Sequence, residues 1–225
     1  MNSYKAYLAV RNPDGSIQTS VTTRSKSDLP AGDVLIKVAY SSLNYKDALS
    51  ATGAPGVTKN YPHVPGIDAS GEVVESQVPE FKPGDAVLVT GYDLGVETDG
   101  GYGEYIRVPA DWVVPIPSGL TKRESMIFGT AGFTAALSVH SLIHNNILPD
   151  SGPVLVTGAT GGVGCIAVAI LAKLDYTVIA STGKSSEHDF LKKLGASTVI
   201  DRDEINDQSG RPLLKSSYAG AVDTV

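Results

Sequence analysis

The sequence VLVTGATGGVG, from Val154 to Gly164, is followed directly by the apolar stretch CIAVAILAKL. The apolar, β-branched residues predict a strand, the glycines a tight turn, and the second apolar stretch a helix. A strand, a glycine-rich turn and a helix N-terminus in this order are typical of a dinucleotide-binding unit. The sequence therefore predicts a nucleotide site at this turn.

The glycines of this turn have separate expected roles. Gly158 allows the sharp turn. Gly161 or Gly162 lets the backbone approach a pyrophosphate, and Gly164 lets the helix pack closely against the strand. The free N–H groups and the dipole of the helix would then face an anion. An ordinary strand-to-helix loop is the alternative, but the flanks match on both sides and a second strand–helix unit follows.

Strands and helices alternate strictly in the second half of the chain, which indicates an α/β fold with a doubly wound parallel sheet. Gly195 is expected to end the second helix of this series. We predict strand 154–158, helix 162–174, strand 176–181, helix 186–194, strand 198–200 and a further strand in AGAVDTV, residues 219–225.

Residues 1 to about 120 are β-like and rich in turns, and the texture of the sequence changes near Thr121. We therefore expect two domains, 1–120 and 121–225. After Thr121, TKRESMIFGTAGFTAALSVHSLIHNN predicts two helical pieces with a break at GTAGFT. In the first half, NYKDALSATG (Asn44–Gly53) predicts a short helix, and strands are expected in VLIKVAYS from Val34, SGEVVES from Ser70, DAVLVTG from Asp85 and GEYIRVP from Gly103.

The composition excludes several classes of protein. A net charge of −6 argues against a nucleic-acid partner and against a polybasic membrane surface. The single cysteine, Cys165, excludes an intramolecular disulfide and a Cys-rich zinc site. The N-terminus does not read as a signal peptide, and the apolar runs are shorter than a membrane span requires. We expect a cytoplasmic protein without a membrane partner.

The end of the second predicted strand indicates which nucleotide is bound. NAD-binding units carry an acidic residue there, whereas this chain has Ser181, Thr182, Gly183 and Lys184. Hydroxyls and a cation suit a 2′-phosphate, so NADP(H) is favoured over NAD. Arg202, just past the next strand, could add a second cation. Considered alone, either Lys184 or Arg202 could instead be an ordinary solvated surface charge.

Other polar residues carry weaker signals. His140 and His144 share a helix face, but without a third ligand they read as partly exposed helix residues. His63 reads as a packing residue of a proline-rich loop, and Cys165 as a small buried packing residue. Tyr45, Lys46 and Asp47 follow Asn44 on the short helix, and we take this polar cluster as a candidate active site.

Five segments together resemble the medium-chain dehydrogenase/reductases. The resemblance is strongest to their zinc-free quinone oxidoreductase branch, in particular to the acryloyl-CoA reductase-like proteins, and it covers essentially the whole chain. The segments are SSLNYKDALSATG, YPHVPGIDASGEV, FKPGDAVLVTG, GTAGFTAALSVHSL and VLVTGATGGVG, in the order and spacing of the family.

The resemblance implies a GroES-like catalytic domain followed by the first part of a Rossmann domain. It also implies that no metal is bound, because a Cys near the position of Asn44 and a Cys-rich loop are both missing. Members of the family continue beyond the position of Val225, so the chain is expected to be truncated at its C-terminus. In relatives, the residues that match Asn44 and Tyr45 lie beside the nicotinamide, and the threonine that matches Thr130 contacts the cofactor. The diphosphate and the 2′-phosphorylated ribose are contacted by the residues that match Thr160, Gly161, Gly162, Val163, Thr182, Gly183, Lys184 and Arg202.

The implied reaction is hydride transfer from NADPH to an activated C=C bond, as in acryloyl-CoA or an enone, or to a quinone. The protein must orient the cofactor and stabilise enolate charge. Tyr45, with Lys46 or Asp47, is the candidate for orienting the site or delivering a proton. We expect small-molecule substrates, and we expect the chain to form a homo-oligomer, namely a dimer.

Two other function classes share features of this sequence. TGATGGVG also fits the short-chain dehydrogenases, but these place it near the N-terminus and need a Tyr-x-x-x-Lys pair. In this chain the residue four positions after Tyr218 is Val222, where the pair would require lysine. That hypothesis is rejected. A non-catalytic NADPH-binding sensor or crystallin-like structural protein stays open, because it would keep the same glycine turn.

Overall fold

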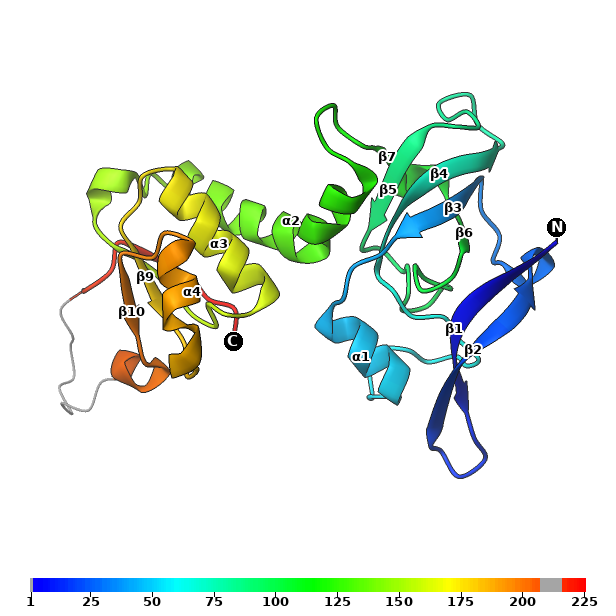
Figure 1. The fold of residues 1–225 in the computed structure, drawn as a ribbon, viewed down its shortest axis with the longest axis horizontal. Helices are drawn as coiled ribbons and strands as arrows, with labels where there is room; N and C mark the ends of the chain where they lie inside the picture. The colour runs from blue at the N-terminus through cyan, green and yellow to red at the C-terminus, as the bar shows by residue number, and fades with distance from the viewer. Residues whose placement is uncertain (1, 207–215) are drawn as a thin grey trace. The chain divides into compact units, whose positions relative to one another are not determined.

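A computed structural model describes residues 2–206 and 216–225 of the chain. The internal contacts divide it into two compact units, Met1–Thr130 and Ala131–Val225. Figure 1 follows the chain from the blue N-terminal hairpin through the first unit to the strands and helices of the second. The domain ranges 1–120 and 121–225 stay a prediction.

The first unit is built on a five-stranded antiparallel sheet. Its inward-facing valines and isoleucines form a buried cluster that includes Val34, Val87 and Ile106. The strands predicted from Val34, Ser70, Asp85 and Gly103 are all present. In sheet order the strands are β6 (Tyr105–Val108), β3 (Val34–Tyr40), β4 (Asp68–Ser76), β5 (Ala86–Thr90) and β7 (Val114–Pro115).

A separate two-stranded hairpin precedes this sheet. Strands β1 (Ser3–Arg11) and β2 (Ile17–Ser25) pair in antiparallel register around the NPDG turn. The residues of β1 that face inward, Tyr4 and Ala6, are buried with Leu35 of the sheet. The hairpin therefore packs on the five-stranded sheet through β1.

Helix α1 (Tyr45–Thr52) confirms the short helix predicted near Asn44. The Asp47 carboxylate accepts the backbone N–H of Asn44 at 2.8 Å, which stabilises the first turn. Gly53 ends the helix with φ of 75°.

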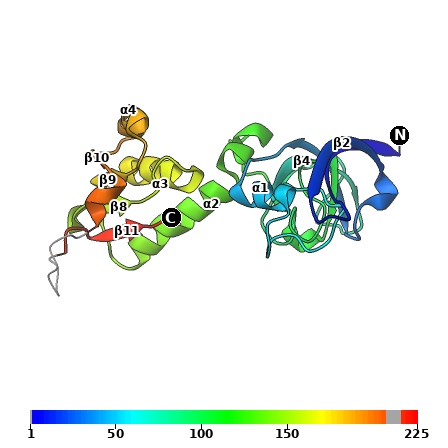
Figure 2. The same cartoon turned by 90° about the horizontal axis from the view of Figure 1, so that it is seen from below.

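The second unit contains the predicted parallel sheet. Figure 2 shows its strands next to one another in the order β10, β9, β8, β11, and all three neighbouring pairs are parallel. Helix α3 (Gly162–Lys173) follows β8, and α4 (His188–Lys193) follows β9, as the alternation predicted. The strands are β8 (Val154–Val156), β9 (Val178–Ser181), β10 (Thr198–Ile200) and β11 (Gly220–Val222).

Helix α2 (Lys122–His144) contains the predicted break. Gly129 has φ of 50° and ψ of −153°, so the helix is interrupted there. By length and composition α2 could cross a membrane. The break leaves neither piece with the about 20 residues that a crossing needs. Short 3-10 helices occupy Lys26–Asp28, Ala110–Trp112, Pro149–Ser151, Ser185–Glu187 and Arg202–Ile205.

Candidate functional site

A cavity of about 560 Å³ lies in the second unit, at the carboxyl ends of its parallel strands. Strand order reverses between β8 and β11, and open parallel sheets bind ligands at such a point. The cavity is lined by Thr157, Gly158, Thr160, Ser181, Thr182, Gly183, Lys184, Arg202, Asp203, Ile205, Asn206, Asp223 and Val225.

The glycine turn has the geometry that its sequence predicted. Gly158 turns the chain with φ of 54°. A Cβ on Gly164 would lie 2.5 Å from the carbonyl oxygen of Gly158, so only glycine lets α3 approach the turn this closely. Gly161 is the residue before α3, and Gly162 and Val163 form its first turn. The Gly161 N–H donates to the Gly158 carbonyl at 2.8 Å, so the N–H groups of Gly162 and Val163 make this helix end suitable for an anion.

Ser181 is a buried residue whose side chain is available for a ligand. It ends β9 and is 1% exposed, and its hydroxyl has no hydrogen-bond partner among the described residues. A buried hydroxyl without a partner is costly, so a ligand that bonds to it would be stabilised. Thr182 Oγ1 lies 3.4 Å from Thr160 Oγ1 and accepts the N–H of Lys184 at 3.1 Å.

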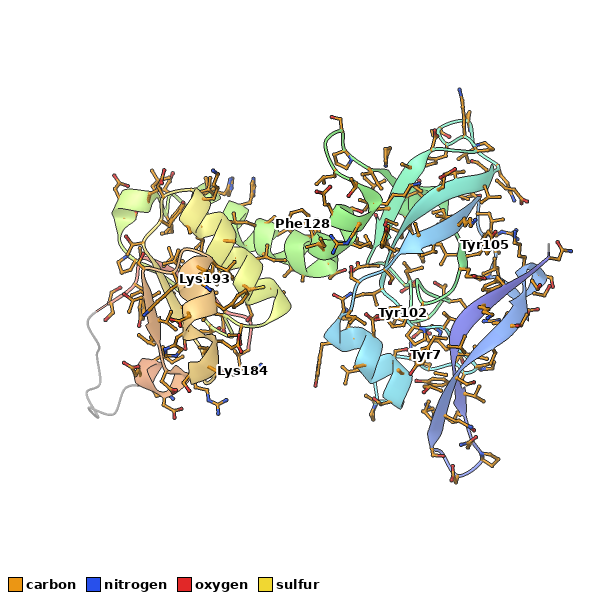
Figure 3. The ribbon with its side chains drawn as sticks, viewed as in Figure 1. Tyr7, Tyr102, Tyr105, Phe128, Lys184 and Lys193 are labelled. Carbon is orange, nitrogen blue, oxygen red and sulfur yellow. The ribbon has the colours of Figure 1, made fainter. Side chains whose placement is uncertain are left out.

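Lys184 and Arg202 follow neighbouring strands, β9 and β10, and both line the cavity. The Arg202 side chain lies against the backbone of Gly183, where a Cβ would be 2.9 Å from Nε. Figure 3 shows Lys184 apart from Lys193, which lies on α4. Two carboxylates also line the cavity: Asp203, and Asp223, which accepts the Thr157 hydroxyl.

The predicted active-site residues of the first unit lie at the start of α1. Asn44 is half-buried, and its Nδ2 donates to Asp68 Oδ2 at 2.8 Å. Tyr45 is 80% exposed, and Lys46 is exposed beside it. Asn44 also lines a cavity of about 450 Å³ together with Tyr7, Leu43, Asp47, Ala48, Ala51 and Tyr102. Tyr7 and Tyr102 lie near each other beside α1 (Figure 3), with ring centroids 6.3 Å apart.

Asp47 is buried and fully engaged with its surroundings. Besides the N–H of Asn44, it accepts the N–H of Ile67 at 2.9 Å and the Tyr102 hydroxyl at 3.0 Å. Burial, reinforced by the charge of Asp47, raises the pKa of Tyr102 well above its usual value. These bonds favour a structural role for Asp47, and its catalytic role stays a prediction.

Asp68 is the residue of this region that sequence reasoning missed. Its side chain is completely buried and accepts from Asn44 and from Thr130, which donates both its N–H at 2.9 Å and its hydroxyl at 2.6 Å. These partners are 24 and 62 residues away in sequence, so no local pattern reveals the cluster. Thr130 directly follows the break in α2.

The remaining candidates lie apart from these two regions. His63 is buried in its loop, as predicted. His140 and His144 are exposed and stack on each other. Cys165 is half-buried, which raises the pKa of its thiol. No group of three or more His, Cys, Asp or Glu that could hold a metal occurs in the described part of the chain.

Comparisons with known proteins agree with this geometry. Residues 30–118 match the alcohol dehydrogenase GroES-like domain. The chain is 51% identical over 222 residues to the putative quinone oxidoreductase YhfP of Bacillus subtilis, covering 99% of the chain and 67% of that relative. It is 49% identical over 218 residues to the probable acrylyl-CoA reductase AcuI of Escherichia coli, covering 97% and 67%. The chain thus spans about two thirds of the length of these relatives.

Solved structures give the same result. E. coli YhdH with bound NADPH superposes with a TM-score of 0.93 at 49% identity, over 97% of the chain and 67% of that structure. B. subtilis YhfP with NAD bound superposes with a TM-score of 0.94 at 50% identity, over 98% and 67%. Both units therefore have counterparts in nucleotide-bound structures.

Proposed function

Since the chain belongs to the medium-chain dehydrogenase/reductase superfamily, in the branch of quinone oxidoreductase and acrylyl-CoA reductase relatives, we propose that the protein is an NADPH-dependent reductase. It transfers a hydride to an activated C=C bond of the acryloyl-CoA or enone type, or to a quinone. We further propose that it works as a cytoplasmic homodimer on small-molecule substrates and without a bound metal.

The observation that carries this proposal is the cavity of the second unit. Its glycine turn leads into a helix N-terminus suited to a diphosphate. The unpartnered hydroxyl of Ser181 and the two cations Lys184 and Arg202 suit a phosphorylated ribose. An uncharged ribose would leave both cations without an anionic partner on the ligand.

Two observations work against NADP(H). The YhfP relative was crystallised with NAD, and Asp203 lies in the same cavity as Arg202. Asp203 belongs to the 3-10 helix that starts at Arg202, whereas Ser181 occupies the strand end at which NAD-binding proteins carry their acidic residue. We therefore assign the choice of nucleotide to Ser181, Lys184 and Arg202.

Bound NADPH supplies the hydride, and the residues of the chain supply binding, orientation and charge stabilisation. The N-terminus of α3 holds the diphosphate, while Ser181, Lys184 and Arg202 hold the 2′-phosphate. Asn44, Tyr45 and Thr130 bind the nicotinamide end. The Tyr45 ring packs against the bound cofactor, and the neighbouring Lys46 orients the substrate carbonyl, on which negative charge develops during reduction.

An affinity comparison tests the cofactor assignment. We expect Arg202→Ala to weaken NADPH binding about tenfold, because a charge-assisted contact to phosphate is lost, and to leave NADH binding unchanged. Lys193→Ala removes a cation of the same unit that does not line the cavity and should change neither affinity. Equal losses for both nucleotides in Arg202→Ala, or equal affinities in the wild type, contradict the assignment.

Turnover separates the reductase from a sensor or structural protein. We expect NADPH oxidation that depends on acryloyl-CoA, an enone or a quinone. Tight NADPH binding without oxidation by any of these acceptors would reject the reductase proposal in favour of a sensor.

A further inference from the structure

We propose that Gly183 is a positioning residue for the choice of nucleotide, because its missing side chain leaves room for the guanidinium of Arg202 in the cavity. The inference rests on the proposed function, since it takes the cavity of the second unit to hold a 2′-phosphorylated ribose. It assigns part of the preference for NADPH to a residue without a functional group, which acts by fixing where the charge of Arg202 lies.

The parallel pairing of β9 with β10 brings the two residues together. Ser181 is paired with Ile200, and the N–H of Thr182 donates to the Ile200 carbonyl at 3.1 Å, so the pairing extends to the end of both strands. Gly183 and Arg202 each come two residues after a member of the Ser181–Ile200 pair. They therefore leave neighbouring strands at the same edge of the sheet, where both line the cavity.

The Arg202 side chain occupies the space that a side chain at position 183 would need. A Cβ built on Gly183 would lie 2.9 Å from Nε, 3.1 Å from Cδ and 3.1 Å from Cζ of Arg202. These atoms belong to the outer part of a flexible side chain, so a larger residue at position 183 would displace the guanidinium. Gly183 does not adopt a positive φ, and alanine there would meet no backbone strain.

Ion pairs do not hold the guanidinium of Arg202. It is exposed and takes part in none of the ion pairs of the described residues, although Asp201, Asp203 and Glu204 are its neighbours in sequence. The Asp201 carboxylate accepts the N–H of Asp203 at 2.9 Å, and the Glu204 carboxylate accepts the N–H of Asp201 at 2.8 Å. The charge of Arg202 therefore stays available for an anion of the ligand.

Contact with Gly183 prepares this charge for binding. Ordering a free, exposed arginine on a ligand costs conformational entropy, and a side chain that already lies in place loses less. The planar guanidinium can lie flat against a backbone without a Cβ, and its N–H groups then have a defined direction toward a phosphate. A displaced guanidinium would keep its charge but lose this direction.

Gly183→Ala tests the idea through the ratio of the dissociation constants for NADH and NADPH, measured by titration calorimetry. We expect the preference for NADPH to fall about fivefold, through weaker binding of the 2′-phosphate. A general disturbance of the turn would weaken both nucleotides equally and leave the ratio unchanged.

A double variant identifies the route of the effect. Once Arg202→Ala has removed the guanidinium, adding Gly183→Ala should change the preference by less than about twofold. A direct clash between the added methyl group and the phosphate would instead lower the preference further in the double variant. That result would reject a role through Arg202.

Gly220→Ala is the matched control in the same unit. A Cβ there would also meet the end of a flexible side chain, Leu142 Cδ2 at 2.8 Å, but Gly220 does not line the cavity. This variant should leave the preference unchanged.

Arg202→Lys keeps the test decisive even if Gly183→Ala does not fold. Lysine retains the charge but has no planar group to lie against Gly183, so we expect the preference for NADPH to fall about fivefold. An unchanged preference in Gly183→Ala or in Arg202→Lys overturns the positioning role and leaves the reductase proposal standing. A wild-type protein that does not prefer NADPH overturns the cofactor assignment of the proposed function, and this inference with it.

Discussion

Tyr45 is 80% exposed, whereas Asp47, two residues further along α1, is buried. A proton donor must be held in place by its surroundings, and no hydrogen bond of the described residues holds the Tyr45 phenol. We therefore expect Tyr45→Phe to keep turnover within about threefold, since a ring that packs on the cofactor does not need its hydroxyl. Tyr45→Ala should lower turnover about tenfold. Steady-state rates with saturating NADPH decide: a loss of about 10²-fold in Tyr45→Phe would instead assign proton delivery to the phenol.

The raised pKa of Tyr102 predicts how the free energy of unfolding depends on pH. Burial and the Asp47 carboxylate raise its pKa above the ordinary value of 10.0. The unfolded chain then ionises this phenol at a lower pH than the folded protein does, so the free energy of unfolding falls as the pH rises above about 10. Tyr102→Phe should lower stability at neutral pH by about 1 kcal/mol, through the lost hydrogen bond, and should flatten the decline in alkaline solution.

Urea unfolding between neutral pH and about pH 11 measures this effect. Tyr7→Phe is the matched control, because Tyr7 stands against the Tyr102 ring and has no hydroxyl bond to Asp47. Some decline remains in both variants, since burial also raises the pKa of Tyr4. An equally steep decline in Tyr102→Phe and Tyr7→Phe would show that Tyr102 is not its source.

The residues that sequence reasoning found and missed differ in the range of their contacts. Ser181, Lys184 and Arg202 were predicted because strand ends in a parallel sheet meet at one edge, which places them in one cavity. Asp68 was missed because a buried carboxylate is recognised only by its partners. Those partners come from a loop and from α2, and nothing beside Asp68 in the sequence marks them.

At the scale of elements, the break in α2 places the strictest requirement on a single residue, because only glycine suits position 129. Gly129 needs a backbone conformation that L-residues rarely adopt, and its missing Cβ makes room for Ser42 and Asp68. We expect Gly129→Ala to lower the free energy of unfolding by about 2 kcal/mol or more, from backbone strain together with the clash. The urea midpoint measures it.

Gly15→Ala separates the two contributions. Gly15 also has a positive φ, of 86°, but a Cβ there would meet nothing within 4 Å. Its substitution should therefore cost about 1 kcal/mol, the cost of strain alone. Equal losses at both positions would show that the close contacts of Gly129 do not matter.

Elements with strong local signals were predicted well. Strand β10 occupies the predicted residues, and α3 and α1 agree with their predictions to within a residue or two at each end. Strands β1 and β2 were covered only by the general β-like texture of the first half. The reason lies in β2, IQTSVTTRS, none of whose residues is fully buried, so its sequence carries no apolar face. β8 is shorter than predicted, because Thr157 and Gly158 already belong to the turn.

At the scale of the whole molecule, the sequence indicated a β-rich part followed by a parallel α/β part, and the two compact units have these architectures. The parallel direction of the strands in the second unit follows from the alternation of strands and helices. The sheet order of the first unit does not, because β6 lies beside β3 and β7 beside β5 through long connections. Such antiparallel pairings depend on contacts that no local pattern encodes.

The small number of cysteines and histidines in the chain predicts that the protein binds no zinc. The chain has one cysteine and four histidines, which are His63, His140, His144 and His188. His63 is buried in its loop, and His140 and His144 lack a third ligand in the described residues. A stable zinc site requires at least three protein ligands, most often Cys or His. We therefore expect less than about 0.1 zinc per chain by elemental analysis of protein purified without chelator, and unchanged NADPH oxidation after dialysis against EDTA.

A His140→Ala/His144→Ala variant controls for weak surface binding, because any zinc lost with these side chains was bound at the exposed pair. One zinc per chain that survives this substitution and whose removal stops turnover would place the protein outside the zinc-free branch.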